Sequence, residues 1–236
     1  MSLPAGFPPL AGPARDAAIL GFARTGDLAC VWSPITVSVG EHTATFSVCQ
    51  NGVSLGGVRL AASAALAQQV ADVLQCSLGT PRLLDEAWLQ ATIQIPPAIV
   101  VPNTSDTAAM VTHSEKVDGY AGSSGGSLTM PIGKPWVLAK AATASQAALY
   151  GWQSSSAISG VPLYKSPATP GVHVVQPLST AHATDYVDYS SSLWFVSRDC
   201  TVDGADRDLW DILKDPVLAL LASHEGPLVN VRQPGV

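Results

Sequence analysis

The sequence predicts an α+β fold with small antiparallel β-sheets, a helical hairpin in the N-terminal part and a C-terminal helix. Apolar and polar residues alternate in the segments 35–39 and 44–48, which is typical of strands with one buried face. The windows 63–76 and 80–89 instead combine helix-capping residues with apolar residues at helical spacing. The second half contains short apolar runs separated by Pro and Gly, and these runs indicate further short strands.

An extended arm and a helix are expected at the N-terminus. Residues 1–12 are rich in Pro, which indicates an extended arm. Pro13 suits the first turn of a helix, and Gly26 suits its end. We therefore expect one α+β domain over 13–236. A subdivision of that domain into 13–102 and 103–236 is left open.

A hairpin and a third strand should follow. The two alternating segments flank a turn at 40–42. Asn51-Gly52 is a second tight-turn signal, so the sequence predicts a third strand over 53–60.

Two helices are predicted next. Ser63 can cap a helix that runs through Cys76. Thr80 and Pro81 supply a cap and a first-turn proline for the second helix. The apolar residues expected to point inward are Leu66, Val70, Val73 and Leu74 on the first helix and Leu83, Leu84, Ala87, Trp88 and Leu89 on the second.

The rest of the chain shows weaker patterns. Ile99 to Val101 lie between prolines and indicate an extended crossing segment, while residues 103–133 are polar and rich in Gly and Ser, which predicts a long loop. Asp206 can cap a final helix, and a second apolar turn is expected at 217–221. Short strands are predicted at 136–139, 147–152, 172–176 and 193–196.

Composition limits the class of protein. The 236 residues are 47% hydrophobic and only 13% charged, against about 25% charged in an average soluble domain. So few charges suit a chain whose surface is buried in an assembly, and an ordinary Ala-rich protein is the alternative interpretation. The net charge of −6 and the absence of a basic run argue against nucleic-acid binding.

Cysteine usage and targeting signals give further limits. Cys30, Cys49, Cys76 and Cys200 form no CxxC pair, which argues against a zinc ribbon or a thioredoxin-type motif. Four free thiols are favoured over two disulfides in a chain of this length. The N-terminus lacks the pattern of a secretory signal, and no apolar run reaches about 18 residues, so no membrane span is expected. No cofactor is predicted, and whether a metal binds is left open.

Chemistry-bearing residues concentrate in 173–190, where an interval without acidic residues at 119–184 ends. His182, Asp185 and Asp188 have the spacing H-x2-D-x2-D. Imidazole and carboxylate groups at this spacing could bind a metal, or form a general base with an orienting carboxylate. The alternative is a polar turn in which these side chains cap backbone amides.

Two other motifs match catalytic patterns, but the residues around them do not fit a catalytic site. Residues 122–126 match G-x-S-x-G, but this nucleophile motif needs an apolar strand before it and the preceding residues are polar. Cys76 and His182 have the order of a papain-like pair, yet Cys76 lies near the end of a predicted helix, where a thiolate is not stabilised. A Gly/Ser loop and a core cysteine are the favoured interpretations. The tryptophans expected in the core are Trp88, Trp136, Trp152, Trp194 and Trp210.

Several segments together resemble a family of uncharacterised bacterial and phage-borne proteins, over about Ala29 to Pro227. They are LQCSLGTPRLLDEAW near residue 80, ALYGWQ at 148–153, VVQPLSTAHATDYVDYS at 174–190, and the closing VDG and DILKDPVLALLASHEGPL. The family pattern carries YGWH and QPL-x3-H-x3-Y-x-D-Y-S-H, and its activity is not known. The family positions retained here are His113, Lys134, Gln176, His182, Tyr186, Asp188 and Ser190.

This chain departs from the family pattern at two histidines, where it has Gln153 and Ser191. Gln and Ser cannot replace His as a general base or as a good metal ligand. The resemblance therefore implies an enzyme-like scaffold whose site is degenerate, and a fold can be reused in this way for binding or architecture.

Two functional hypotheses follow. The first is a structural or interaction protein, a phage virion component and pseudoenzyme that forms a homo-oligomer and contacts other virion or assembly proteins; the bacterial cytoplasm is the alternative location. The second is a cell-wall (peptidoglycan) hydrolase with His182 as base, oriented by Asp188. If the chain is an enzyme, Gln176 and His113 are expected to converge on the same cleft.

Overall fold

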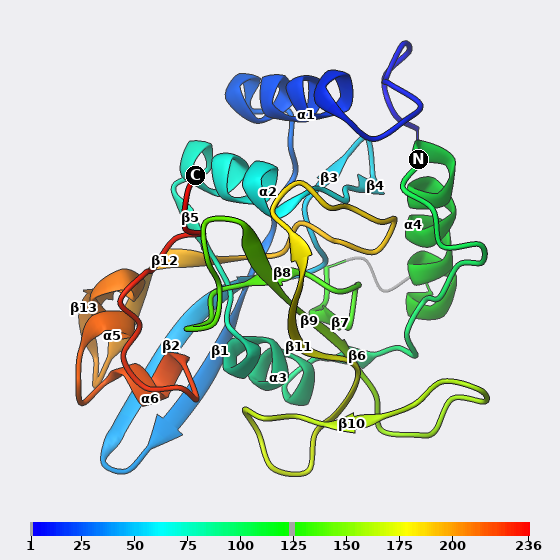
Figure 1. The fold of residues 1–236 in the computed structure, drawn as a ribbon. Helices are drawn as coiled ribbons and strands as arrows, with labels where there is room; N and C mark the ends of the chain where they lie inside the picture. The colour runs from blue at the N-terminus through cyan, green and yellow to red at the C-terminus, as the bar shows by residue number, and fades with distance from the viewer. Residues whose placement is uncertain (1, 123–125) are drawn as a thin grey trace.

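The computed structural model describes residues 2–122 and 126–236, and it confirms the α+β fold (Figure 1). Buried apolar side chains from Ile19 to Val231 form one large hydrophobic cluster. No helix within the described ranges is both long and apolar enough to cross a membrane.

The larger sheet joins strands from both ends of the chain. It contains β1 (Trp32–Val39), β2 (His42–Cys49), β12 (Phe195–Val202) and β13 (Ala205–Asp208) in the order β1-β2-β12-β13, and β5 (Cys76–Leu78) also pairs with β12. All of these pairs are antiparallel. β12 therefore completes a sheet that the N-terminal hairpin begins.

A second antiparallel sheet carries the candidate site. Its strands are β8 (Trp136–Val137), β9 (Gln146–Gln153), β11 (His173–Ala183) and β10 (Tyr164–Lys165), in the order β10-β11-β9-β8. The register between β11 and β9 shifts twice, so β11 is irregular along its length. A hydrogen bond of 2.8 Å from the Leu138 amide to the carbonyl that follows β5 connects this sheet to the larger one.

Helices and two short strand pairs complete the fold. The helices in the described residues are α1 (Pro13–Thr25), α2 (Ala64–Val73), α3 (Pro81–Leu89), α4 (Thr107–Ala121), α5 (Leu209–Lys214) and α6 (Ala219–Ala222). Two further strand pairs are β3 (Ser54–Leu55) with β4 (Val58–Arg59), which is antiparallel, and β6 (Ile93–Gln94) with β7 (Thr129–Met130), which is parallel. In Figure 1 the C-terminal helices, orange to red, lie beside the blue β1–β2 hairpin.

The helix-terminal residues predicted for α1, α2 and α3 are confirmed. Pro13 occupies the first turn of α1, and Gly26 ends it in the left-handed conformation. The side chains of Ser63 and Thr80 accept hydrogen bonds from backbone amides three residues later, at the starts of α2 and α3. Each cap satisfies an amide that would otherwise lack a partner.

Several predicted boundaries are wrong. The segment 53–60 is not one strand, because a turn at Gly56-Gly57 folds it into the β3–β4 hairpin. The first helix of the helical hairpin ends at Val73, and Cys76 begins β5. The final helix begins after Asp208 instead of Asp206, since Asp206 belongs to the β12–β13 hairpin. Two residues expected to point inward are exposed instead, namely Val73 and Leu89.

The largest error concerns 103–133, which was expected to be a loop. Residues 107–121 form α4, capped by the Asp106 side chain. The buried face of α4 carries Ala109, Met110, His113, Ser114 and Val117. These five residues have helical spacing, but two of them are polar. The apolar periodicity is therefore weak, and the sequence pattern did not indicate a helix.

The N-terminal arm is held by the same chain. The backbone amide and hydroxyl of Thr107 donate hydrogen bonds to the carbonyls of Pro9 and Pro8, at 2.9 and 2.7 Å. The Ser2 amide donates to the Gly56 carbonyl at 3.1 Å. The arm thus bridges the first turn of α4 and the β3–β4 turn.

Candidate functional site

The centre of the site is a buried ion pair between Lys134 and Asp188. Lys134 lies between β7 and β8, and Asp188 lies in the loop that follows β11. The Lys134 Nζ is 2.7 Å from the Asp188 Oδ2. The two residues are 9% and 3% exposed, so little water reaches the pair.

Other donors complete the environment of the Asp188 carboxylate. The Ser190 amide and hydroxyl donate to Oδ1 at 2.8 and 2.7 Å. Ser191 donates to the same oxygen at 3.3 Å, and the Tyr186 hydroxyl donates to Oδ2 at 3.2 Å. Burial alone would raise the pKa of Asp188, but the ion pair with Lys134 and the hydrogen bonds outweigh it and hold the pKa below its ordinary value. The carboxylate is therefore ionised and its acceptor sites are well occupied.

Close backbone contacts fix this geometry. A Cβ added to Gly133 would lie 2.6 Å from the Ser190 carbonyl oxygen, and one added to Gly151 would lie 2.7 Å from the Gly133 carbonyl oxygen. Both glycines have positive φ, and so does the next residue, Trp152, at φ 56°. Three chain segments meet here at distances that only glycine allows.

Aromatic rings surround the ion pair on one side. The Lys134 Nζ lies 5.0 Å from the centre of the Trp152 ring, a cation–π distance. Trp152 in turn contacts Tyr189, with ring centres 6.4 Å apart, and Tyr189 meets His113 edge-on at 5.3 Å. The Tyr189 hydroxyl accepts a hydrogen bond of 2.8 Å from the Val100 amide.

His113 is a buried, neutral member of this cluster. It is 2% exposed, and its Nε2 has no hydrogen-bond partner among the described residues. Burial lowers the pKa of His113 to about 4, and the nearby charges of Arg59 and Lys134 act in the same direction. Asp188 raises this pKa and offsets part of the effect. An imidazole in such surroundings packs as an aromatic side chain at neutral pH.

His182 lies near Asp188 but is not among its hydrogen-bond partners in the described part of the chain. Its ring stacks on the Tyr186 ring, with centres 3.9 Å apart and planes 11° apart. Tyr186 then donates to Asp188, so a tyrosine connects the two residues that were expected to form a base and its orienting carboxylate. Gln176 lies on β11 and donates to the Pro177 carbonyl at 2.9 Å. The catalytic roles of all four predicted residues stay predictions.

A second buried carboxylate, Asp85, was not among the site residues predicted from the sequence. Asp85 on α3 is fully buried, and it accepts hydrogen bonds from Tyr150 at 2.8 Å, from the Gln153 amide at 3.0 Å and from Ser166. Burial raises the pKa of Asp85, against the effect of these hydrogen bonds. A signal was present, because Asp85 lies three positions before Trp88 and therefore on the same face of the predicted helix as this apolar residue.

Gln153 and Ser191, the two positions that the resemblance singled out, thus lie against two different carboxylates. Gln153 donates to Asp85, and Ser191 donates to Asp188. Both side chains are fully buried. Each neutral residue contributes a hydrogen bond to a buried acid, where a histidine would bring a group that can gain a proton.

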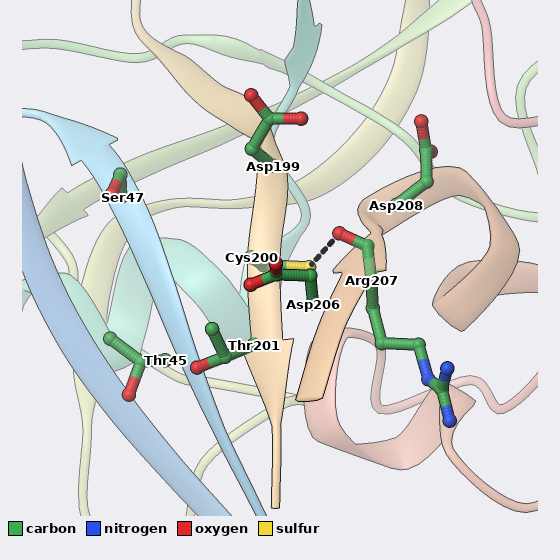
Figure 2. A pocket seen from close by; sticks show the side chains of 8 residues that line it. All are labelled: Thr45, Ser47, Asp199, Cys200, Thr201, Asp206, Arg207 and Asp208. Carbon is green, nitrogen blue, oxygen red and sulfur yellow. Dashed lines mark hydrogen bonds between the residues drawn. The ribbon is translucent and has the colours of Figure 1, made fainter. Parts of the chain in front are cut away.

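Several surface hollows lie away from these residues. Five hollows of about 200 to 590 Å³ in the described part of the chain have linings that include none of His113, Gln176, His182 and Asp188. The largest, shown in Figure 2, is a shallow depression over β2, β12 and β13. Its side chains are Thr45, Ser47, Asp199, Cys200, Thr201, Asp206, Arg207 and Asp208.

The remaining motif predictions have mixed outcomes. Residues 123–125, which carry the serines of the G-x-S-x-G match, lie outside the described residues. Cys76 is 2% exposed in β5, and burial raises the pKa of its thiol, which disfavours a nucleophilic thiolate. Within the described ranges, no group of three His, Cys, Asp or Glu side chains could hold a metal ion.

Comparisons with family models, with curated proteins and with solved structures find no match to this chain.

Proposed function

We propose that this chain is a structural or interaction protein, a phage virion component built on an enzyme-like scaffold with a degenerate site. The observation that carries the proposal is the state of Asp188. Its carboxylate is buried, paired with Lys134, and hydrogen-bonded by three further residues. A carboxylate in this state stabilises a fold, whereas a catalytic carboxylate must reach a substrate or a second catalytic group.

The neighbouring groups support the same proposal. His113 is buried with a pKa lowered to about 4, so it is a poor general base for a substrate in solution. Gln153 and Ser191 are buried, neutral side chains that donate hydrogen bonds to the carboxyl groups of Asp85 and Asp188.

Surface composition supports an assembly role. Only 13% of the residues are charged. Several apolar side chains also remain largely exposed, and the most exposed of them are Leu10, Val31, Val101, Val217 and Val229. Such positions are available for contact with neighbouring chains. The assignment to a virion follows from the resemblance to phage-borne proteins.

The first test is the native mass of the purified chain, measured by light scattering on a sizing column over a wide range of concentrations. We expect a defined oligomer whose mass is a multiple of one chain. A monomer at every concentration would contradict self-assembly.

A second test separates this proposal from the hydrolase hypothesis. Purified wild-type protein and His182→Ala are incubated with peptidoglycan, and the release of soluble fragments is followed. We expect no release by either protein. Release by the wild type that is lost in His182→Ala would overturn the proposal, because it would show that His182 acts in catalysis.

A further inference from the structure

Two cysteines face each other at the open end of the β1–β2 hairpin. Cys30 lies two residues before β1, and Cys49 is the last residue of β2. The two sulfur atoms are 3.0 Å apart, and both thiols are free. A disulfide has sulfur atoms about 2.05 Å apart, so bond formation requires a movement of about 1 Å.

The backbone around both thiols is already held in place. The Gln50 amide donates to the Val31 carbonyl at 2.7 Å, beside the Trp32–Cys49 pair of the hairpin. On the other side of Cys30, Ala29 exchanges two hydrogen bonds with Ser54, at 2.8 and 3.0 Å. The approach of the two sulfurs therefore follows from the fold.

We propose that Cys30 and Cys49 are oxidised to one intramolecular disulfide, and that the oxidant is a low-molecular-weight disulfide such as oxidised glutathione. This inference does not depend on the proposed function. Cys30 is partly exposed while Cys49 is fully buried, so the incoming disulfide reacts first with Cys30. Cys49 then acts as the resolving thiol.

The exchange proceeds in two balanced steps. The Cys30 thiol loses its proton, its thiolate attacks one sulfur of the small disulfide, and one small thiolate leaves. The Cys49 thiol then loses its proton and attacks the Cys30 sulfur, which displaces the second small thiolate. The two protein thiols are oxidised to one disulfide, the small disulfide is reduced to two thiolates, and the two protons pass to those thiolates.

The state of the thiols makes this exchange slow in the folded protein. The hydrogen bond to Cys49 is the main cause that raises the pKa of Cys30, and burial and the nearby Cys76 add to it. Thiolate is the attacking species, so the reaction needs long exposure to the oxidant. The result is a stable covalent closure of the residues 30–49.

The test is peptide mapping of the intact chain after incubation with oxidised glutathione, with unreacted thiols alkylated before digestion. We expect one disulfide that links the Cys30 and Cys49 peptides. The control Cys200→Ser should form the same link, because Cys200 contacts the Arg207 carbonyl in β12–β13. Cys30→Ser should form none.

Thermal unfolding gives a second readout. A disulfide that closes a loop of this length should raise the Tm by roughly 6–12 °C, and a reductant should reverse the shift. Cys30→Ser should show no such shift. If both cysteines remain alkylated after oxidation, or if Cys49 links to Cys76 instead, the proposal is overturned. Mapping of the wild type decides this even if Cys30→Ser does not fold.

Discussion

Replacement of Asp188 by Asn should show how much the buried ion pair contributes to stability. The substitution keeps the size and one acceptor oxygen but removes the negative charge. Lys134 would then keep its charge with only 11% of its side chain exposed. Leaving one member of a buried pair without its partner costs about 3–5 kcal/mol, which is a large part of the 5–15 kcal/mol that is typical for a whole domain.

The matched control is Asp72→Asn. Asp72 pairs with Arg232, with Nη2 2.8 Å from Oδ2, but the two side chains are 33% and 39% exposed. Exposed pairs contribute about 0–1 kcal/mol. The same chemical change should therefore have a small effect at Asp72 and a large effect at Asp188.

Urea unfolding followed by tryptophan fluorescence measures both free energies of unfolding. The double variant Lys134→Met with Asp188→Asn completes the comparison, and it should lose less stability than the sum of the two single variants because no charge is left unpaired. Equal losses for Asp188→Asn and Asp72→Asn would refute the view that the Lys134–Asp188 pair organises this site.

Three further predictions follow from the structure. The pKa of His113 is about 4 in the folded chain and about 6.5 in the unfolded chain, so only the unfolded chain gains a proton as the pH falls. The free energy of unfolding should therefore decrease by about 2 kcal/mol between pH 7 and pH 5. His113→Phe should remove this decrease, and the exposed control Thr112→Ala should keep it. Gly133→Ala should lower the free energy of unfolding by more than about 3 kcal/mol, since the added Cβ would lie 2.6 Å from a carbonyl oxygen. The control Gly119→Ala in α4, where no atom lies within 4 Å of the added Cβ, should raise it by about 0.5–1 kcal/mol in the same urea denaturation assay. Deletion of residues 1–12 should abolish the oligomer on a sizing column and leave a folded monomer; a truncated chain that does not fold would show that the arm belongs to the core.

Local sequence signals predicted much of the fold. The alternating hairpin and the caps at Ser63 and Thr80 are confirmed, because each depends on residues close together in the chain. The helix at 107–121 was missed since its buried face includes His113 and Ser114. Their partners come from other segments, so hydrophobic periodicity could not reveal that this face is buried.

The site was predicted only in part for the same reason. Asp188 was singled out from its own neighbourhood, but its partner Lys134 is 54 positions away. Nothing local to either residue indicates their pairing. Asp85 was passed over because an acidic residue on a helix is usually solvated, and the donors from Tyr150 and Gln153 become visible only when β9 packs against α3.

The position of β12 has a consequence for how the chain is made. β12 (Phe195–Val202) pairs with both β2 and β5, and a ribosome synthesises those strands long before it reaches residue 195. Until then, the edges of β2 and β5 that face β12 carry unpaired backbone groups, which can pair wrongly with other chains. Formation of the larger sheet must therefore wait until most of the chain has been translated. A nascent chain that stalls before Phe195 would leave these edges open to aggregation or to capture by chaperones.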